Sequence, residues 1–169
     1  MYKSNTVVHI IPFFLLLLLV LFQSSYNNLL YFKQYTPFYE LIVIFFWCSF
    51  LPRSMPIVFL ILIGLFRDFL LMTPIGISAA SFVLLKLMVA KQEVLIKDRS
   101  YFVTFMLFLV DVVMICILQI LVLLMTLSVD FFVLVKIFFS RIPATLMLYI
   151  PASWLFHVIF KILSSKEDA

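Results

Sequence analysis

The stretch GLFRDFLLMTPIGISAA, residues 64–80, places two charged side chains in an apolar segment. Arg67 and Asp68 are adjacent, and the only two glycines of the chain, Gly64 and Gly76, stand on either side of them. Adjacent helix positions point about 100° apart, so we do not expect these two charges to pair with each other. We predict that each charge has its own partner elsewhere, and that the glycines mark a turn and a close helix contact.

The composition around this stretch indicates a membrane protein. Hydrophobic residues are 66% of the 169 residues and charged residues are 12%, against about 45–50% and about 25% in soluble domains. The mean hydropathy is +1.27. The net charge is +4, but the basic residues stand mostly between apolar runs, where they orient a chain in the bilayer. We therefore expect lipid contact and no nucleic acid.

The apolar runs predict an all-α integral membrane protein with six transmembrane helices in a single domain over residues 1–169. The expected spans cover 7–25, 37–51, 56–72, 76–96, 101–126 and a segment within 131–163. The last segment contains Arg141, Pro143 and Pro151. Because proline removes a backbone donor, we expect a helix break near Arg141 to Pro143 and a bend near Pro151.

The distribution of basic residues predicts the orientation. With six spans, one side of the membrane collects most of them: Lys3, Arg53, Lys91, Lys97, Arg99, Lys161 and Lys166. The connections on the other side contain Lys33 as their one clear basic residue. The positive-inside rule then places both termini in the cytoplasm. The charged link over residues 90–101 is read as a solvated loop, with contact to a cytoplasmic partner as the alternative.

Among the other charges within the predicted spans, Asp111 and Arg141 are candidate functional residues. Asp111 is about ten residues into the fifth span, near its middle, so it must be protonated, paired or facing a polar cavity. Candidate partners are the basic residues Arg67, Lys86, Lys136 and Arg141. Three interpretations of the charges remain open at this point: an internal network that fixes helix register, a polar pocket for a ligand, or a docking point for a partner's helix.

The residues after Asp68 predict a tight hairpin between the third and fourth spans. Pro74 and Gly76 are suited to a turn, since proline fixes φ and glycine allows positive φ. Gly76, Ala79 and Ala80 form a run of small residues, and small residues let helix backbones approach closely in lipid. Asp68 then has two possible roles. It accepts hydrogen bonds from the turn amides at 74–76 and holds the hairpin shut, or it meets a donor on a partner's helix.

No residue pattern points to an enzyme or a cofactor. The chain has no G-x-S-x-G and no H-E-x-x-H, which mark common hydrolase and metalloprotease sites. No cluster of Cys and His has metal-ligand spacing. We therefore expect no catalytic residue, no metal and no cofactor.

The hairpin residues carry a resemblance to a known family. Their order is similar to the G-x-x-x-D and P-x-G-x-x-A signature of the MreD family, the rod shape-determining membrane proteins; the matching residues are Gly64, Asp68, Pro74, Gly76 and Ala79. The length and the six-span hydropathy also fit that family. Arg67 has no place in the family pattern.

The resemblance implies a non-enzymatic part of the bacterial cell-elongation machinery in the inner (plasma) membrane, which supports peptidoglycan synthesis and cell shape. Members act with MreC, a bitopic protein, and through it with MreB and with RodA and penicillin-binding-protein synthases. Their fold is similar to the substrate-binding subunit of energy-coupling-factor transporters, so the alternative is a vitamin-binding subunit of such an importer. The expected partner-binding or structural residues are Gly64, Arg67, Asp68, Pro74, Gly76, Ala79 and Ala80.

Overall fold

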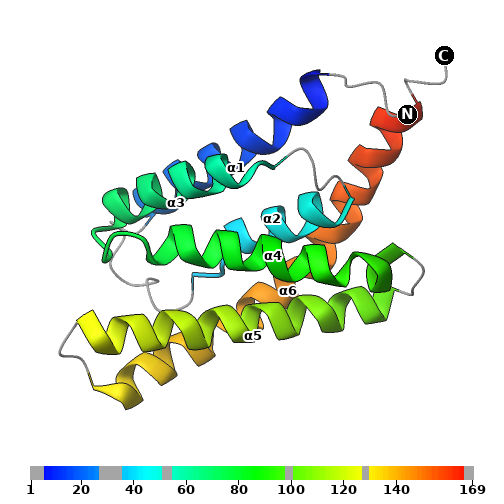
Figure 1. The fold of residues 1–169 in the computed structure, drawn as a ribbon. Helices are drawn as coiled ribbons and strands as arrows, with labels where there is room; N and C mark the ends of the chain where they lie inside the picture. The colour runs from blue at the N-terminus through cyan, green and yellow to red at the C-terminus, as the bar shows by residue number, and fades with distance from the viewer. Residues whose placement is uncertain (1–5, 27–35, 51–54, 98–100, 127–129, 166–169) are drawn as a thin grey trace.

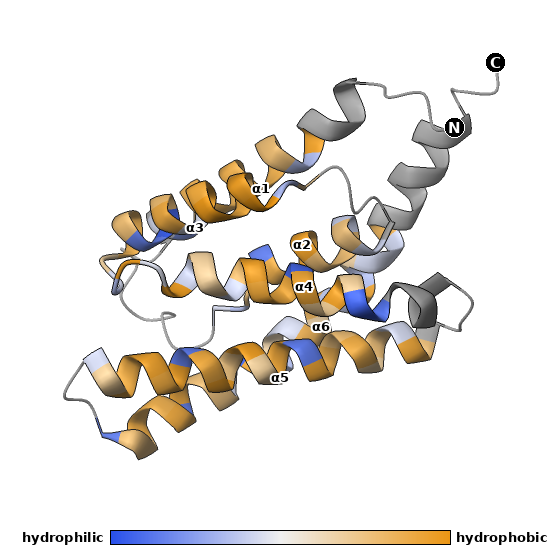
Figure 2. Ribbon diagram, viewed as in Figure 1, coloured by the Kyte–Doolittle hydropathy of each residue, from blue (hydrophilic) through white to orange (hydrophobic). Residues whose placement is uncertain are grey.

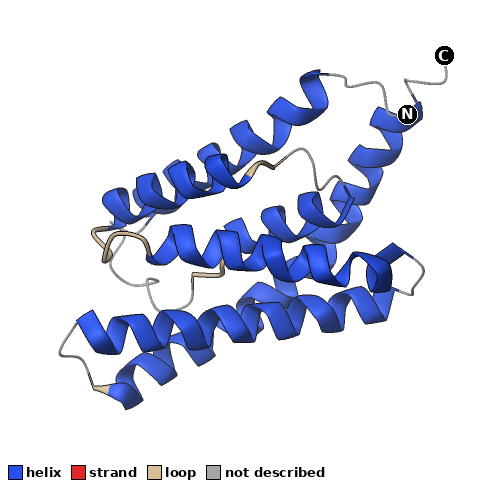
Figure 3. Ribbon diagram, viewed as in Figure 1, coloured by secondary structure: helices blue, strands red, loops and turns tan. Residues whose placement is uncertain are grey.

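Helices account for all the regular structure in the part of the protein that the computed structural model describes (Figures 1 and 3). Backbone is described for residues 6–26, 36–50, 55–97, 101–126 and 130–165, and side chains for 11–24, 36–49, 55–92, 102–126 and 130–155. The helices are α1 (Thr6–Tyr26), α2 (Tyr39–Phe50), α3 (Ile57–Leu71), α4 (Ile77–Lys97), α5 (Tyr101–Thr126) and α6 (Phe131–Ser165). The all-helical prediction is confirmed.

Two helical segments are long and apolar enough to cross a membrane within the described residues, Phe102–Thr126 and Phe131–Leu155. The others are shorter or less apolar there. For example, α2 has 12 residues, or about 18 Å at 1.5 Å per residue, against a hydrocarbon core of about 30 Å. Membrane contact is thus compatible with the structure, and six complete spans remain a prediction.

Helix α2 lies in the centre of the bundle, against α1, α4 and α6 (Figure 1). Every residue from Leu41 to Cys48 is buried. A helix that is apolar on all sides is stable when other helices pack around it. This explains why α2, the shortest helix, lies at the core. One hydrophobic cluster joins side chains of α2 to side chains from the other five helices.

Most of the described ribbon has the colour of hydrophobic residues (Figure 2), and many large apolar side chains are exposed. On α3, the side chains of Val58, Leu62 and Phe69 are 65%, 56% and 76% exposed. On α6, Phe132 is 84% exposed. Soluble monomers rarely expose large contiguous apolar patches, and exposed apolar side chains in such numbers are typical of lipid or partner contact.

The predicted break in the last helix is wrong. Helix α6 continues from Phe131 to Ser165 through both Pro143 and Pro151. Each proline removes one backbone hydrogen bond, whereas a break in an apolar environment would leave several more backbone groups unpaired. Thr145 also donates its hydroxyl to the Arg141 carbonyl at 2.8 Å. The ribbon of α6 changes direction along its length (Figure 1), as helices with internal prolines do.

Candidate functional site

The chain reverses direction between α3 and α4 within residues 72–76. Met72 ends α3 in the left-handed region, with φ of 53° and its N–H bonded to the Asp68 carbonyl. The Thr73 N–H donates to the same carbonyl at 3.1 Å. Gly76 has φ of 101°, which glycine adopts without strain. The predicted turn is therefore confirmed, and we call this end of the bundle the turn end.

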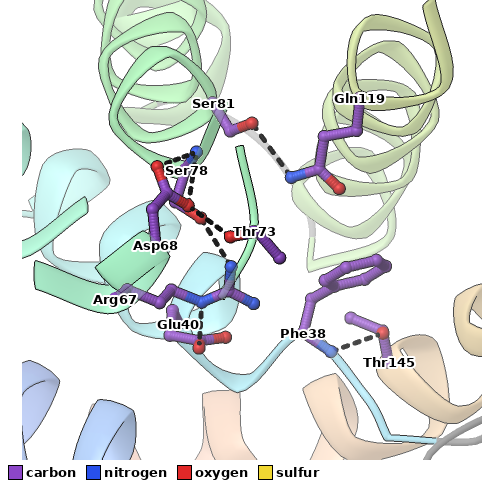
Figure 4. Close-up of polar contacts among 9 residues, drawn as sticks. All are labelled: Phe38, Glu40, Arg67, Asp68, Thr73, Ser78, Ser81, Gln119 and Thr145. Atoms are coloured by element: carbon purple, nitrogen blue, oxygen red, sulfur yellow. Dashed lines mark hydrogen bonds and ion pairs between the residues drawn. The ribbon is translucent and has the colours of Figure 1, made fainter. Parts of the chain in front are cut away.

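The Asp68 carboxylate holds the hairpin shut from inside (Figure 4). Its Oδ2 accepts from the Gly76 N–H at 2.8 Å and from the Ser78 N–H at 3.1 Å. Its Oδ1 accepts from the Thr73 hydroxyl at 3.0 Å. Asp68 is fully buried, and a negative charge at the N-terminus of α4 satisfies free amides and complements the helix dipole. The first of the two predicted roles is confirmed.

The Arg67 guanidinium turns toward a different helix. Its Nε donates to Glu40 Oε1 of α2 at 2.8 Å, and its Nη1 donates to the Ser78 hydroxyl at 2.6 Å (Figure 4). Glu40 is 1% exposed, so this ion pair is buried. Arg67 and Asp68 do not pair with each other, as predicted, although both bond to Ser78, Arg67 to its hydroxyl and Asp68 to its N–H. Sequence reasoning missed Glu40, although a lone acid at the start of an apolar segment is the signal that could have found it.

Gly64 brings the backbones of α3 and α4 into direct contact. A Cβ atom added at Gly64 would lie 2.4 Å from Ala79 Cα and 2.5 Å from Ala79 N. Only a residue without a side chain fits there. The expected close packing of the two helices is confirmed, with Gly64 and Ala79 as the contact pair.

Gly76, the residue before α4, and Ala80 take no part in this contact. A Cβ atom at Gly76 would meet nothing within 4 Å, and Ala80 is exposed. The Ala80 N–H donates to the Gly76 carbonyl at 2.8 Å, so the two residues stack one turn apart. The run of small residues is thus divided between an inner contact at Ala79 and an outer small-residue face formed by Gly76 and Ala80.

Asp111 is paired with an amide, and the four basic residues proposed as its partners form no ion pair with it. Its Oδ1 accepts from Gln92 Nε2 of α4 at 2.8 Å, and its Oδ2 has no hydrogen-bond partner. Lys86 instead donates to the Met55 carbonyl. Asp111 and Asp68 share no partner. None of the four candidate bases is its hydrogen-bond partner, because the amide of Gln92 faces Asp111 across the α4–α5 contact.

Arg141 lies at the turn end, on the wall of a cavity. Its guanidinium carbon is 5.7 Å from the Phe38 ring centroid and 5.9 Å from the Phe138 ring centroid. Such positions allow cation–π attraction. The cavity has a volume of about 230 Å³ and is also lined by Arg67. The structure therefore brings Arg67 and Arg141 to one cavity and leaves Asp111 outside it.

Two further polar contacts at the turn end were not predicted (Figure 4). Gln119 Nε2 of α5 donates to the Ser81 hydroxyl of α4 at 2.9 Å. The Phe38 N–H, at the start of α2, donates to Thr145 Oγ1 of α6 at 3.0 Å. Amides and hydroxyls inside apolar segments are the sequence signal for such contacts, because they need partners when buried.

Lys3, Lys33, Arg53, Arg99 and Lys166 lie outside the described residues. Among the residues that are described, no group of three or more His, Cys, Asp or Glu is placed to hold a metal ion.

Comparisons of the chain with protein-family models, with curated proteins and with solved structures found no match. The resemblance to the MreD family therefore rests on the residues of the hairpin and on the hydropathy of the chain.

Proposed function

We propose that the protein is a non-enzymatic membrane component of MreD type that docks the transmembrane helix of an MreC-like bitopic partner. Through that partner it would act with MreB and with RodA and penicillin-binding-protein synthases in cell elongation. In this proposal the chain has six spans in the bacterial inner membrane and both termini are cytoplasmic. The all-helical bundle and its apolar surface support a membrane location.

One observation carries the proposal: the signature residues converge on a single structural element. Gly64 admits the backbone of α4 at Ala79, Asp68 binds the N-terminal amides of α4, and Gly76 supplies the positive φ of the turn. The place of each of these residues in the hairpin requires its residue type. The spacing that resembles the family pattern therefore corresponds to one structural element, the α3–α4 hairpin.

The outer small-residue face is the part of this hairpin that can receive a partner. Asp68 is buried and its oxygens are used internally, which leaves the docking role to Gly76 and Ala80. Helix pairing in lipid depends on close van der Waals contact, and small residues permit it. The partner helix would pack along α4 at this face.

Copurification with a coexpressed MreC-like bitopic protein tests the docking. Ala80→Leu fills the outer face without strain, because Ala80 is exposed and helical. The matched control is Ala90→Leu, at another exposed alanine of α4. We expect Ala80→Leu to lose the partner at normal folded yield and Ala90→Leu to keep it. Full retention of the partner by Ala80→Leu contradicts docking at this face.

Reporter fusions test the orientation. Fusions after Gly76 and after Asp130 should report the periplasm, and a fusion after Lys97 should report the cytoplasm. A periplasmic signal at Lys97 would contradict the six-span arrangement.

The cavity at the turn end favours a second candidate function, the small-molecule (vitamin) binding subunit of an energy-coupling-factor type importer. That function requires a vitamin that copurifies with the protein and a coupling subunit that docks to it. Recovery of the bitopic partner without a coupling subunit would decide for the first candidate.

A further inference from the structure

The cavity at the turn end is formed where five helices and the residue before α2 meet. Its walls come from α1, α3, α4, α5 and α6 together with Thr36, Phe38 and Thr73. Its volume of about 230 Å³ exceeds that of the engineered cavity of about 150 Å³ that holds benzene. The space is therefore large enough for a small organic group.

The charge on the walls of this cavity is positive. Arg67 and Arg141 line it, and no carboxylate does so among the described residues. The nearby acids do not line the cavity: Glu40 pairs with Arg67 Nε and offsets one of the two positive charges, and Asp68 accepts from the amides of the turn and α4. Two guanidinium groups in apolar surroundings favour an anion between them, since guanidinium binds phosphate through paired hydrogen bonds.

Both guanidinium groups are held in place before any ligand arrives. Glu40 and Ser78 fix two nitrogens of Arg67, and its remaining terminal nitrogen points away from them toward Phe38 (Figure 4). The Phe38 and Phe138 rings beside Arg141 are stacked with centroids 6.1 Å apart. Preorganised donors lower the entropy that binding must overcome.

A buried polar atom on the same wall lacks a partner. Gln23 of α1 is 4% exposed, and its Oε1 accepts no hydrogen bond. An unsatisfied buried carbonyl costs about 1–3 kcal/mol, so a donor supplied by a ligand would stabilise this position. The rest of the wall is largely apolar, with Leu71, Leu123 and Leu134 among the lining residues.

We propose that this cavity binds an organic phosphate. The phosphate oxygens accept from Arg67 and Arg141, a hydroxyl of the ligand donates to Gln23 Oε1, and an apolar part packs on the leucines. The headgroup of an acidic phospholipid and a free phosphate ester share this chemistry. The proposal does not depend on partner docking, because none of its residues belongs to the outer small-residue face.

Calorimetric titration of the purified protein in a neutral detergent tests the site. One arm compares hexyl phosphate with hexanol, and the other compares dihexanoyl phosphatidylglycerol with dihexanoyl phosphatidylcholine. We expect the phosphate-bearing or anionic member of at least one pair to bind more tightly. Binding of the phosphatidylglycerol alone identifies a lipid headgroup, and binding of hexyl phosphate alone identifies a free ester. Equal binding within both pairs overturns the proposal.

Two variants locate the binding. Arg141→Gln should weaken it by about 10- to 100-fold, the effect of losing a charge-assisted hydrogen bond. Lys136→Gln is the matched control, because Lys136 is an exposed base on the same helix and does not line the cavity. It should change binding less than about 2-fold. Unchanged affinity in a folded Arg141→Gln protein also overturns the proposal.

Gln23→Leu keeps the proposal testable if Arg141→Gln fails to fold. The substitution removes an unpaired buried oxygen, so the folded protein should be at least as stable as the wild type. Binding should nevertheless weaken by about 3- to 10-fold through loss of one neutral hydrogen bond. Stable Gln23→Leu protein with wild-type affinity would remove Gln23 from the site and refute the assigned ligand geometry.

Discussion

Gly64→Ala tests whether the hairpin depends on backbone contact. The added methyl would lie 2.4 Å from Ala79 Cα and 2.5 Å from Ala79 N. Carbon atoms in favourable contact are about 3.5–4.0 Å apart, so α3 and α4 would have to separate by about 1 Å. Because the clash is with backbone atoms, Ala79→Gly should not rescue the variant.

The expected cost follows from this displacement. Overpacking lowers the free energy of unfolding by about 1–3 kcal/mol. Alanine in place of glycine within a helix raises it by about 0.5–1 kcal/mol. Separation of the helices would also stretch the bonds from the Ser78 N–H to Asp68, now 3.1 and 3.2 Å, and a hydrogen bond to a charged group contributes about 1.5–3 kcal/mol. We expect Gly64→Ala to lower the free energy of unfolding by about 2–4 kcal/mol.

Unfolding in detergent, followed by circular dichroism against denaturant, measures this loss. Leu62→Ala is the control, because Leu62 is on the same helix and 56% exposed. It should change stability little in detergent. A Gly64→Ala protein as stable as the wild type, or one rescued by Ala79→Gly, would refute the backbone-contact argument.

Four further substitutions, at three positions, probe the polar contacts and the turn. Asp68→Asn should lower stability by about 2–3 kcal/mol, because an amide nitrogen cannot accept from the Gly76 N–H; a wild-type unfolding curve would contradict the capping role. Asp111→Asn should be tolerated, since its carbonyl can still accept from Gln92, whereas Asp111→Leu should cost about 1–3 kcal/mol by leaving that amide unpaired; equal stability of the two variants would be inconsistent with the contact. Met72→Gly should raise stability by about 0.5–1 kcal/mol, because Met72 is 94% exposed and has positive φ; the midpoint of denaturant unfolding reports the change, and a fall would argue against strain there.

The residue order alone determined the helices and the hairpin. Apolar runs interrupted by proline, glycine and charge predicted the first five helices nearly at their observed ends, because hydropathy and turn chemistry act over short distances. The contacts of Asp68 with Gly76 and Ser78 span 8 and 10 residues across one turn. Once the turn forms, these groups must lie close together, so the role of Asp68 could be predicted.

Only the tertiary structure decided the partners of the other charges. The bond from Arg67 to Glu40 joins residues 27 apart, and the Gln92–Asp111 bond joins residues 19 apart. A rotation of one helix by one residue moves a side chain by about 100°, enough to replace one partner by another. The orientation of α4 about its own axis places Ala79 inward and Ala80 outward. The orientations of five helices together bring their side chains to one cavity. Such rotations are chosen by the packing of the whole bundle around α2, which no short stretch of the chain encodes.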